Sequence, residues 1–286
     1  MRFLPVFLLV TVSMHAQNWH LGVYGGAAAY NGDLAEKYFP AHNQTKGAVG
    51  VDLVYEYNEH INIRGGFIYA QVAAYDRYSN NAALLERNLS FQTSISEVSI
   101  LGEYNIFNLY ERRFTPYVYA GLAVFHYNPY ANDANNLKTF LRPLSTEGEG
   151  LPGYAGSKSY SLTQPAIPLG IGFKFAISDN VRLGIEAGYR KLFTDYLDDV
   201  SSTYAAESDL LAAKGQKAVD MAYRGDETPL GSPVYPVKGA QRGNANNKDS
   251  YYTLGLHLTF RLGTANDGSG SRRGGHRYYS CPANMF

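Results

Sequence analysis

Apolar and polar residues alternate at every second position through much of this chain. In the sequence VRLGIEAGYR, which begins at Val181, valine, leucine, isoleucine, alanine and tyrosine alternate with arginine, glycine and glutamate. A period of two is that of a β-strand. An apolar face opposite a face of glycine and charged residues is typical of a membrane barrel. Eight segments with this pattern are predicted as strands, at 19–31, 47–57, 61–72, 92–107, 114–127, 163–175, 181–192 and 250–262.

The fourth predicted strand has one irregularity. Its apolar face shifts near Glu97 and Val98. An extra residue in one strand of an antiparallel pair produces such a shift, so the pattern predicts a β-bulge at this position.

The connections between the predicted strands alternate in length. The links at 58–60, 108–113 and 176–180 are short, whereas those at 32–46, 73–91, 128–162 and 193–249 are long and polar. Outer-membrane barrels have short turns at one end and long loops at the other. We therefore predict an all-β fold, an eight-stranded antiparallel transmembrane outer-membrane β-barrel over residues 18–262. Its short turns and both termini are expected in the periplasm and its long loops outside the cell.

The two ends of the chain differ from this pattern. Residues 1–17 begin with Arg2, continue with an apolar run and reach small residues at Ala16, which predicts a secretory signal peptide. The run is shorter than the roughly 20 residues of a spanning helix. Residues 263–286 lack periodicity and predict a periplasmic tail, either a disordered end or a docking peptide for a periplasmic partner. The docking candidates are Arg272, Arg273, Arg277, Tyr278, Tyr279 and Cys281.

The composition narrows the classes of partner. Basic and acidic residues number 25 each, a balance that argues against a nucleic-acid partner. The 25 tyrosines and 14 phenylalanines suit a boundary between lipid and water, so outer-membrane lipid is the expected environment. Cys281 is the single cysteine, which excludes an internal disulfide.

The inward face of the predicted barrel is rich in charge. An eight-stranded barrel is narrow enough for side chains to fill it. Acids and bases occur on this face in comparable numbers, and buried ions need partners, so we expect a structural network paired across the lumen. Passage of ions or protons is the alternative. The predicted lumen residues are Asp52, Glu56, Arg64, Glu103, Lys174, Arg182, Glu186, Arg190, His257 and Arg261.

No catalytic or metal-binding constellation is evident in the sequence. His126 and His257 have no serine and carboxylate at a recognisable spacing. We therefore expect no enzymatic activity, no cofactor, no bound metal and no small-molecule substrate. The acidic residues Asp195, Asp198 and Asp199 could attract a cation, but such a run is more often a solvated loop.

Several segments together resemble one family. They are RNLSFQTSISEVS at 87–99, RFTPYVYAGLAVFHYNP at 113–129, YSLTQPAIPLGIGFKF at 160–175, EAGYRKLFTDYLDDVSSTY at 186–204, RGNANNKDSYYTLGLHLTFRL at 242–262 and Cys-Pro at 281–282. In this order they are similar to the PorG-like outer-membrane proteins of the Bacteroidetes, also known as DUF6089. The most specific part is the loop motif within 190–204, whose residues include Arg190, Lys191, Asp195, Tyr196, Asp198 and Asp199.

The resemblance implies a place in the type IX protein secretion system. In that system, a PorG-like barrel associates with a periplasmic ring built by the PorK lipoprotein and PorN. Its implied role is structural: it anchors or aligns the ring and does not act as an enzyme. The family has no established catalytic residues to carry over. The alternative is a stand-alone small barrel, either a transporter or channel or a lipid-modifying enzyme. Because genomes of the Bacteroidetes carry several PorG-like copies, this chain could also serve a different envelope complex.

Overall fold

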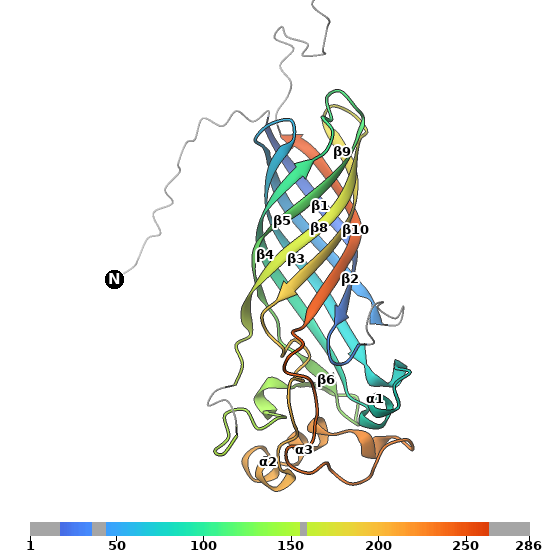
Figure 1. Ribbon diagram of the computed structural model, residues 1–286, viewed down its shortest axis with the longest axis vertical. Helices are drawn as coiled ribbons and strands as arrows, with labels where there is room; N and C mark the ends of the chain where they lie inside the picture. The colour runs from blue at the N-terminus through green and yellow to red at the C-terminus, as the bar shows by residue number, and fades with distance from the viewer. Residues whose placement is uncertain (1–17, 36–43, 155–158, 263–286) are drawn as a thin grey trace, which may run out of the picture.

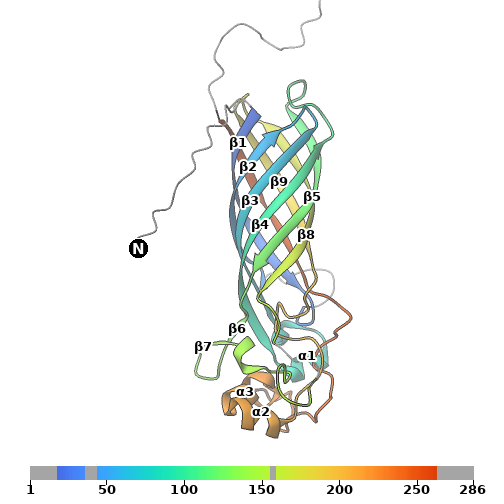
Figure 2. The same cartoon turned by 90° about the vertical axis from the view of Figure 1, so that its left-hand side faces the viewer.

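Eight long antiparallel strands close into a barrel in the computed structural model, which describes residues 18–35, 44–154 and 159–262 (Figures 1 and 2). The predicted signal peptide and C-terminal tail lie outside the described residues. The predicted strand bounds agree with the observed ones to within three residues. The barrel strands are β1 (Trp19–Asn31), β2 (Lys46–Glu56), β3 (Ile61–Tyr75), β4 (Ser90–Asn105), β5 (Phe114–His126), β8 (Thr163–Ala176), β9 (Val181–Leu192) and β10 (Ser250–Leu262).

The sheet closes because its first and last strands pair. β1 and β10 are in register from Trp19 opposite Leu262 to Asn31 opposite Ser250. The other strands pair with their neighbours along the chain, except that β5 pairs with β8. Between these two strands, β6 (Tyr130–Asn132) and β7 (Lys138–Phe140) form a hairpin that joins the edge of β4 at Gln92 opposite Tyr130. The predicted eight-stranded antiparallel barrel is confirmed.

The bulge predicted at Glu97 and Val98 is wrong. β4 pairs with β3 without interruption, with Glu97 opposite Ile68 and Val98 opposite Phe67. Odd-numbered residues of β4 face inward along its whole length. The chemistry of this face changes instead, from apolar residues such as Ile95 near the long loops to charged ones deeper in the barrel.

The short turns are stabilised by local side-chain hydrogen bonds. The Asn58 side chain accepts hydrogen bonds from the backbone N–H groups of His60 and Ile61. Ser178 accepts in the same way from Asn180 and Val181. Asparagine and serine favour turns because their side chains can pair with nearby backbone groups. The tight connections at this end therefore follow from the local sequence.

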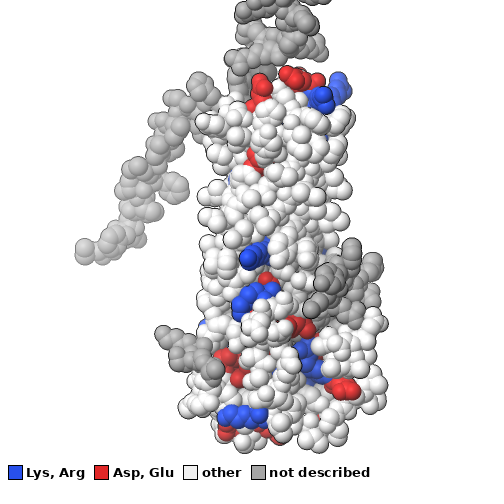
Figure 3. Space-filling model, viewed as in Figure 1, with Lys and Arg blue, Asp and Glu red and all other residues white. Residues whose placement is uncertain are grey.

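An apolar band surrounds the outside of the barrel. Outward residues such as Leu254, Ile171 and Val51 are more than half exposed, and Figure 3 shows the band nearly free of charged side chains. Along β10, residues 252–262 rise roughly 25 Å at about 3.3 Å per residue and about 40° of tilt, which matches the hydrocarbon of an outer membrane.

Aromatic pairs mark both edges of this band. Trp19 and Tyr55 pack at the short-turn edge with ring centroids 5.0 Å apart, and Tyr189 and Tyr252 pack at the other edge at 5.3 Å. Such girdles are typical of membrane interfaces. In the described part of the chain, every helix is too short or too polar to span a bilayer.

The long loops fold into an ordered cap on one end of the barrel (Figures 1 and 2). The sequence suggested polar loops, but side chains such as Leu197, Val200 and Met221 join the top of the barrel in one buried apolar core. The hairpin β6–β7 also belongs to the cap. The other cap elements are η3 (Asp76–Tyr78), α1 (Ala82–Arg87), η4 (Arg142–Leu144), α2 (Glu207–Lys214), α3 (Gln216–Ala222) and η5 (Gly225–Glu227).

Candidate functional site

Three layers of paired charges fill the lumen, and the first lies at the short-turn end. Glu56 is central to it, with an ion pair to Arg182, a longer one to Arg261 (3.6 Å) and a contact of 3.3 Å with the His20 ring. The Tyr110 hydroxyl, from the β4–β5 turn, donates to the Glu56 carboxylate at 2.6 Å. This turn therefore places an aromatic ring over the lumen mouth and ties it to the charge layer.

The middle layer connects opposite walls of the barrel. Arg64 of β3 makes a bidentate contact with Glu186 of β9, at 2.7 and 3.2 Å. Arg64 also lies 3.2 Å from Glu103, which pairs in turn with Lys174. Bidentate arginine–carboxylate contacts add directional strength to charge attraction.

Two further contacts complete the middle layer. The His257 ring lies 2.9 Å from Asp52, and the Tyr117 hydroxyl donates to Glu186 at 2.8 Å. Each acid of the layer therefore has at least one basic or hydroxyl partner.

The third layer lies next to the cap. The Tyr251 hydroxyl donates to Glu97 at 2.5 Å, and Arg190 lies 3.6 Å from the same carboxylate. Arg190 also donates to the Thr253 hydroxyl at 2.5 Å. The sequence analysis missed Glu97 as a lumen residue because it placed a bulge there. Continuous alternation along β4 would have found it.

The structure places all ten predicted lumen residues inside the barrel. Eight of them have an oppositely charged partner, and the other two, Asp52 and His257, contact each other. Tyrosine rings fill much of the remaining space. Those of Tyr117 and Tyr119 lie where side chains on Gly172 and Gly170 would otherwise extend. Paired charges and tyrosine rings packed on glycine therefore fill much of the interior of this barrel.

A cluster of buried carboxylates lies in the cap. Asp195, Asp198 and Asp199 were expected in a solvated loop, and this expectation is wrong because each is at most 2% exposed. Glu147, Glu149 and Asp249 join them from distant parts of the chain. Among the described residues, no group of three or more His, Cys, Asp or Glu side chains has an arrangement that could hold a metal ion.

Hydroxyl donors and one arginine hold this cluster together. Tyr160 and Thr146 each donate to Asp199 at 2.6 Å. The Arg242 guanidinium lies 3.1 Å from Glu147 and donates to the Asp199 backbone carbonyl at 2.6 Å. Ser202 donates through both its backbone and its hydroxyl to Glu147. The buried Arg242 thus contacts two acids of the cluster, Glu147 and Asp199, and hydroxyl and backbone N–H groups are the other hydrogen-bond donors.

Two acids of the cluster share a single hydroxyl. Tyr30 lies 2.6 Å from Asp198 and 2.8 Å from Asp249. A tyrosine hydroxyl has one proton to donate. Burial raises the pKa of both carboxyls well above the usual range, and the nearby charge of Asp249 adds to the effect on Asp198.

Burial has the same effect on other acids of the cap. It raises the pKa of Asp195 to about 7 and that of Asp199 to about 6. Burial, with the nearby charges of Asp199 and Glu147, raises the pKa of Glu149 to about 8. The cap therefore contains acids that change charge near neutral pH.

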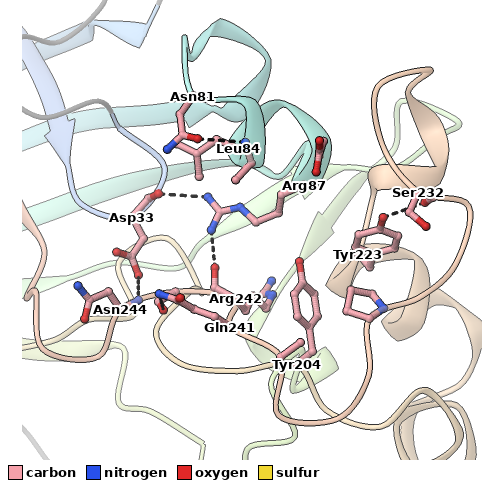
Figure 4. A pocket seen from close by; sticks show the side chains of 15 residues that line it. Asp33, Asn81, Leu84, Arg87, Tyr204, Tyr223, Ser232, Gln241, Arg242 and Asn244 are labelled. Atoms are coloured by element: carbon pink, nitrogen blue, oxygen red, sulfur yellow. Dashed lines mark hydrogen bonds between the residues drawn. The ribbon is translucent and has the colours of Figure 1, made fainter.

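A cleft of about 500 Å³ opens beside this cluster (Figure 4). Arg87 lies on its wall and donates to the backbone carbonyls of Asp33 and Arg242. The Asp33 carboxylate accepts from the Asn244 backbone at 2.7 Å. These contacts join α1 to the β1 loop and to the segment before β10, so the arginine connects three loops of the cap.

The predicted loop motif is divided among three environments. Arg190 lies in the lumen and Lys191 on the outer wall, while Tyr196 stacks on Tyr160 in the cap with ring centroids 4.6 Å apart. The three aspartates of the motif belong to the buried acid cluster. The candidate docking residues of the tail lie outside the described residues.

Comparison with known proteins gives one match to a protein family. Residues 1–140 match the model of the family "Domain of unknown function (DUF6089)". The match covers the first five barrel strands and ends before the 190–204 motif. A search of curated proteins finds no significant match to the sequence.

Solved structures with similar chains include several outer-membrane proteins. Neisserial surface protein A shares 10% identity over 86% of this chain and 97% of its own, with a TM-score of 0.44. A major outer membrane protein of Thermus thermophilus shares 13% over 85% and 99%, with 0.39. OprG of Pseudomonas aeruginosa shares 9% over 86% and 98%, with 0.36. These identities are too low to transfer function, and the fold is established by the chain's own strand pairing.

Proposed function

We propose that this chain is a non-enzymatic outer-membrane subunit of the type IX protein secretion system, which anchors or aligns a periplasmic ring of the PorK/PorN type. The filled, charge-paired lumen is the observation that supports this most directly. Because side chains fill the interior of the barrel, a partner protein would bind at its rims and not within it. The family-model match over residues 1–140 and the resemblance of the later segments favour the same role.

The proposed role implies one orientation. The short turns and both termini would face the periplasm, with the capped end outside the cell, after export directed by residues 1–17. The periplasmic rim would then hold the three short turns and the basic, aromatic tail at 263–286. Cysteine substitutions in the 106–113 turn and in the cap, labelled with a membrane-impermeant reagent on whole cells, test this orientation. Labelling of the turn and not of the cap would contradict it.

Deletion of the tail tests the ring partnership. Removal of residues 272–286 should leave the barrel inserted but reduce co-purification of the ring proteins. A chain of equal length with these residues in scrambled order serves as the control for composition. Full co-purification by the deleted chain would exclude the tail as the docking element. If no ring protein co-purifies even with the intact chain, the secretion role itself is wrong.

A stand-alone channel is the second candidate, because three layers of charged side chains line the lumen below its apolar top. Arg64, Glu186 and Glu103 form a buried network that conduction would have to break. Recordings from purified protein in a planar bilayer separate the two functions. We expect no steady conductance, and a reproducible open level would favour the channel.

A further inference from the structure

A patch of aromatic and basic residues lies on the outside of the barrel, where the long strands meet the cap. Tyr75 ends β3, Arg77 and Tyr78 follow in η3, and the hairpin β6–β7 provides the rest. Tyr75 pairs with Ser90 of β4, and Tyr130 pairs with Gln92 two residues further along the same strand, so the two halves of the patch meet on β4. The patch consists of Tyr75, Arg77, Tyr78, Tyr130, Lys138 and Phe140.

Both cations of the patch are held by aromatic rings. The Arg77 guanidinium carbon lies 4.7 Å from the Tyr75 ring centroid and 4.9 Å from that of Tyr78. The Lys138 ammonium lies 3.8 Å from the Tyr130 ring and 4.9 Å from the Phe140 ring. Such contacts hold a cation in place without neutralising it.

No acid in the described part of the chain lies within 4.0 Å of either cation. Three other cap cations have acidic partners, since Lys217 pairs with Asp133, Arg224 with Glu227 and Lys238 with Asp209. Arg77 and Lys138 are also exposed. Within the described ranges, the Arg77 guanidinium donates only to the Tyr78 hydroxyl, at 3.3 Å, so among these residues the patch presents two ordered positive charges.

The patch is continuous with the lipid-facing band. Outward residues of β4 change from apolar at Val98 to polar at Ser96 and Ser94, which marks the edge of the hydrocarbon. Tyr69 of β3 lies at this edge, and its hydroxyl donates to Ser94 at 3.0 Å. The Lys138 ammonium lies 3.8 Å from the centroid of the Tyr130 ring. The Tyr130 hydroxyl donates to the Gln92 side chain at 3.5 Å, two residues along β4 from Ser94. The ammonium group thus lies just beyond the hydrocarbon, on the side where lipid headgroups carry their phosphates.

From this placement we infer that the patch is a binding site for the phosphate of a membrane lipid headgroup, in the leaflet at the capped end. Arg77 and Lys138 would donate charge-assisted hydrogen bonds to the phosphate oxygens. Tyr78 and Phe140, each 42% exposed, would pack against the headgroup and the upper acyl chain. The inference rests on the membrane location in the proposed function, but not on any ring partner.

Lipid retention by the purified full chain tests this inference. The protein is inserted into vesicles of phosphatidylcholine with a minor fraction of diphosphoryl lipid A, extracted in mild detergent and analysed for bound lipid by native mass spectrometry. The wild type should retain lipid A above its bulk fraction. The variant Arg77→Gln/Lys138→Gln should lose roughly fivefold in this enrichment for each charge removed.

Two matched variants make the result specific. Lys214→Gln/Lys238→Gln also removes two positive charges, but from a part of the cap away from the apolar band. This variant should keep the wild-type enrichment of lipid A. Arg77→Lys/Lys138→Arg keeps the charge and should retain most of it. The inference is overturned if Arg77→Gln/Lys138→Gln retains lipid A like the wild type, or if the cap control loses as much. Failure of the chain to enter vesicles at all would count against the proposed membrane function instead.

Discussion

Arg64 and Glu186 face each other across the lumen, with 2.7 Å between Nη1 of the arginine and Oε2 of the glutamate. They belong to β3 and β9, which are not neighbours in the barrel. Both side chains are almost completely buried. This single contact therefore ties two walls that backbone hydrogen bonds do not join.

Replacement of one partner should weaken the barrel. Glu186→Gln leaves Arg64 with only Glu103 as an acidic partner, and loss of one buried partner costs about 3 kcal/mol. Urea unfolding in lipid vesicles measures the change in the free energy of unfolding. Glu111→Gln, in an exposed turn, should change it by less than about 0.5 kcal/mol. A loss below about 1 kcal/mol for Glu186→Gln would mean that the pair is not a major tie.

The glycine under Tyr117 should not tolerate a methyl group. A Cβ atom at Gly172 would lie 2.3 Å from Cζ of Tyr117, so Gly172→Ala must displace the ring and its bond to Glu186. Overpacking of this kind costs about 1–3 kcal/mol. Gly65→Ala is the matched control, because no heavy atom lies within 4 Å of its added carbon. Equal unfolding free energies for the two variants would contradict the packing argument.

Cap stability should fall as pH rises from about 4 to about 8. Burial raises the pKa of Asp195 to about 7 and of Asp199 to about 6. A carboxyl with a raised pKa in the folded state binds more protons folded than unfolded, so its stabilisation is complete below the unfolded pKa of about 4 and is lost through the folded pKa. Hydrogen-exchange protection of amides at 194–204 should therefore be lower at the alkaline end of this range.

Asp195→Asn provides the control for this pH dependence. The amide mimics the neutral acid, so the variant should be more protected than the wild type at alkaline pH and show a weaker pH dependence. Protection that rises with pH in the wild-type cap would show that the acid cluster is ionised and stabilising.

Arg242 should be essential to the cap and dispensable for the barrel. Its guanidinium lies 3.1 Å from Glu147 and donates to the backbone carbonyls of Asp199 and Ala222. Arg242→Met would leave buried acids without their cation, at a cost of about 3–5 kcal/mol. Limited proteolysis should then cleave within the cap while the barrel strands survive. The exposed Lys238→Met variant should stay intact, and global unfolding by Arg242→Met would show that the cap and barrel fold as one unit.

The sequence by itself determined the strands and their faces. The alternation in β9 and β10 predicts their observed bounds, because a two-residue period depends only on local backbone geometry and burial on one side. It also indicated which charged residues face inward. Glu97 was missed through the wrong bulge, although it continues the same inward row of β4.

Only the tertiary structure decided which charges meet and what covers the loop acids. Arg64 finds Glu186 because closure of the barrel sets β3 opposite β9, a relationship that no local pattern contains. Asp198 and Asp199 have the local character of a solvated loop, yet Tyr30, Tyr160 and Arg242 bury and bind them from distant segments. Pairing and burial depend on residues far apart in the chain, and therefore on the closed fold.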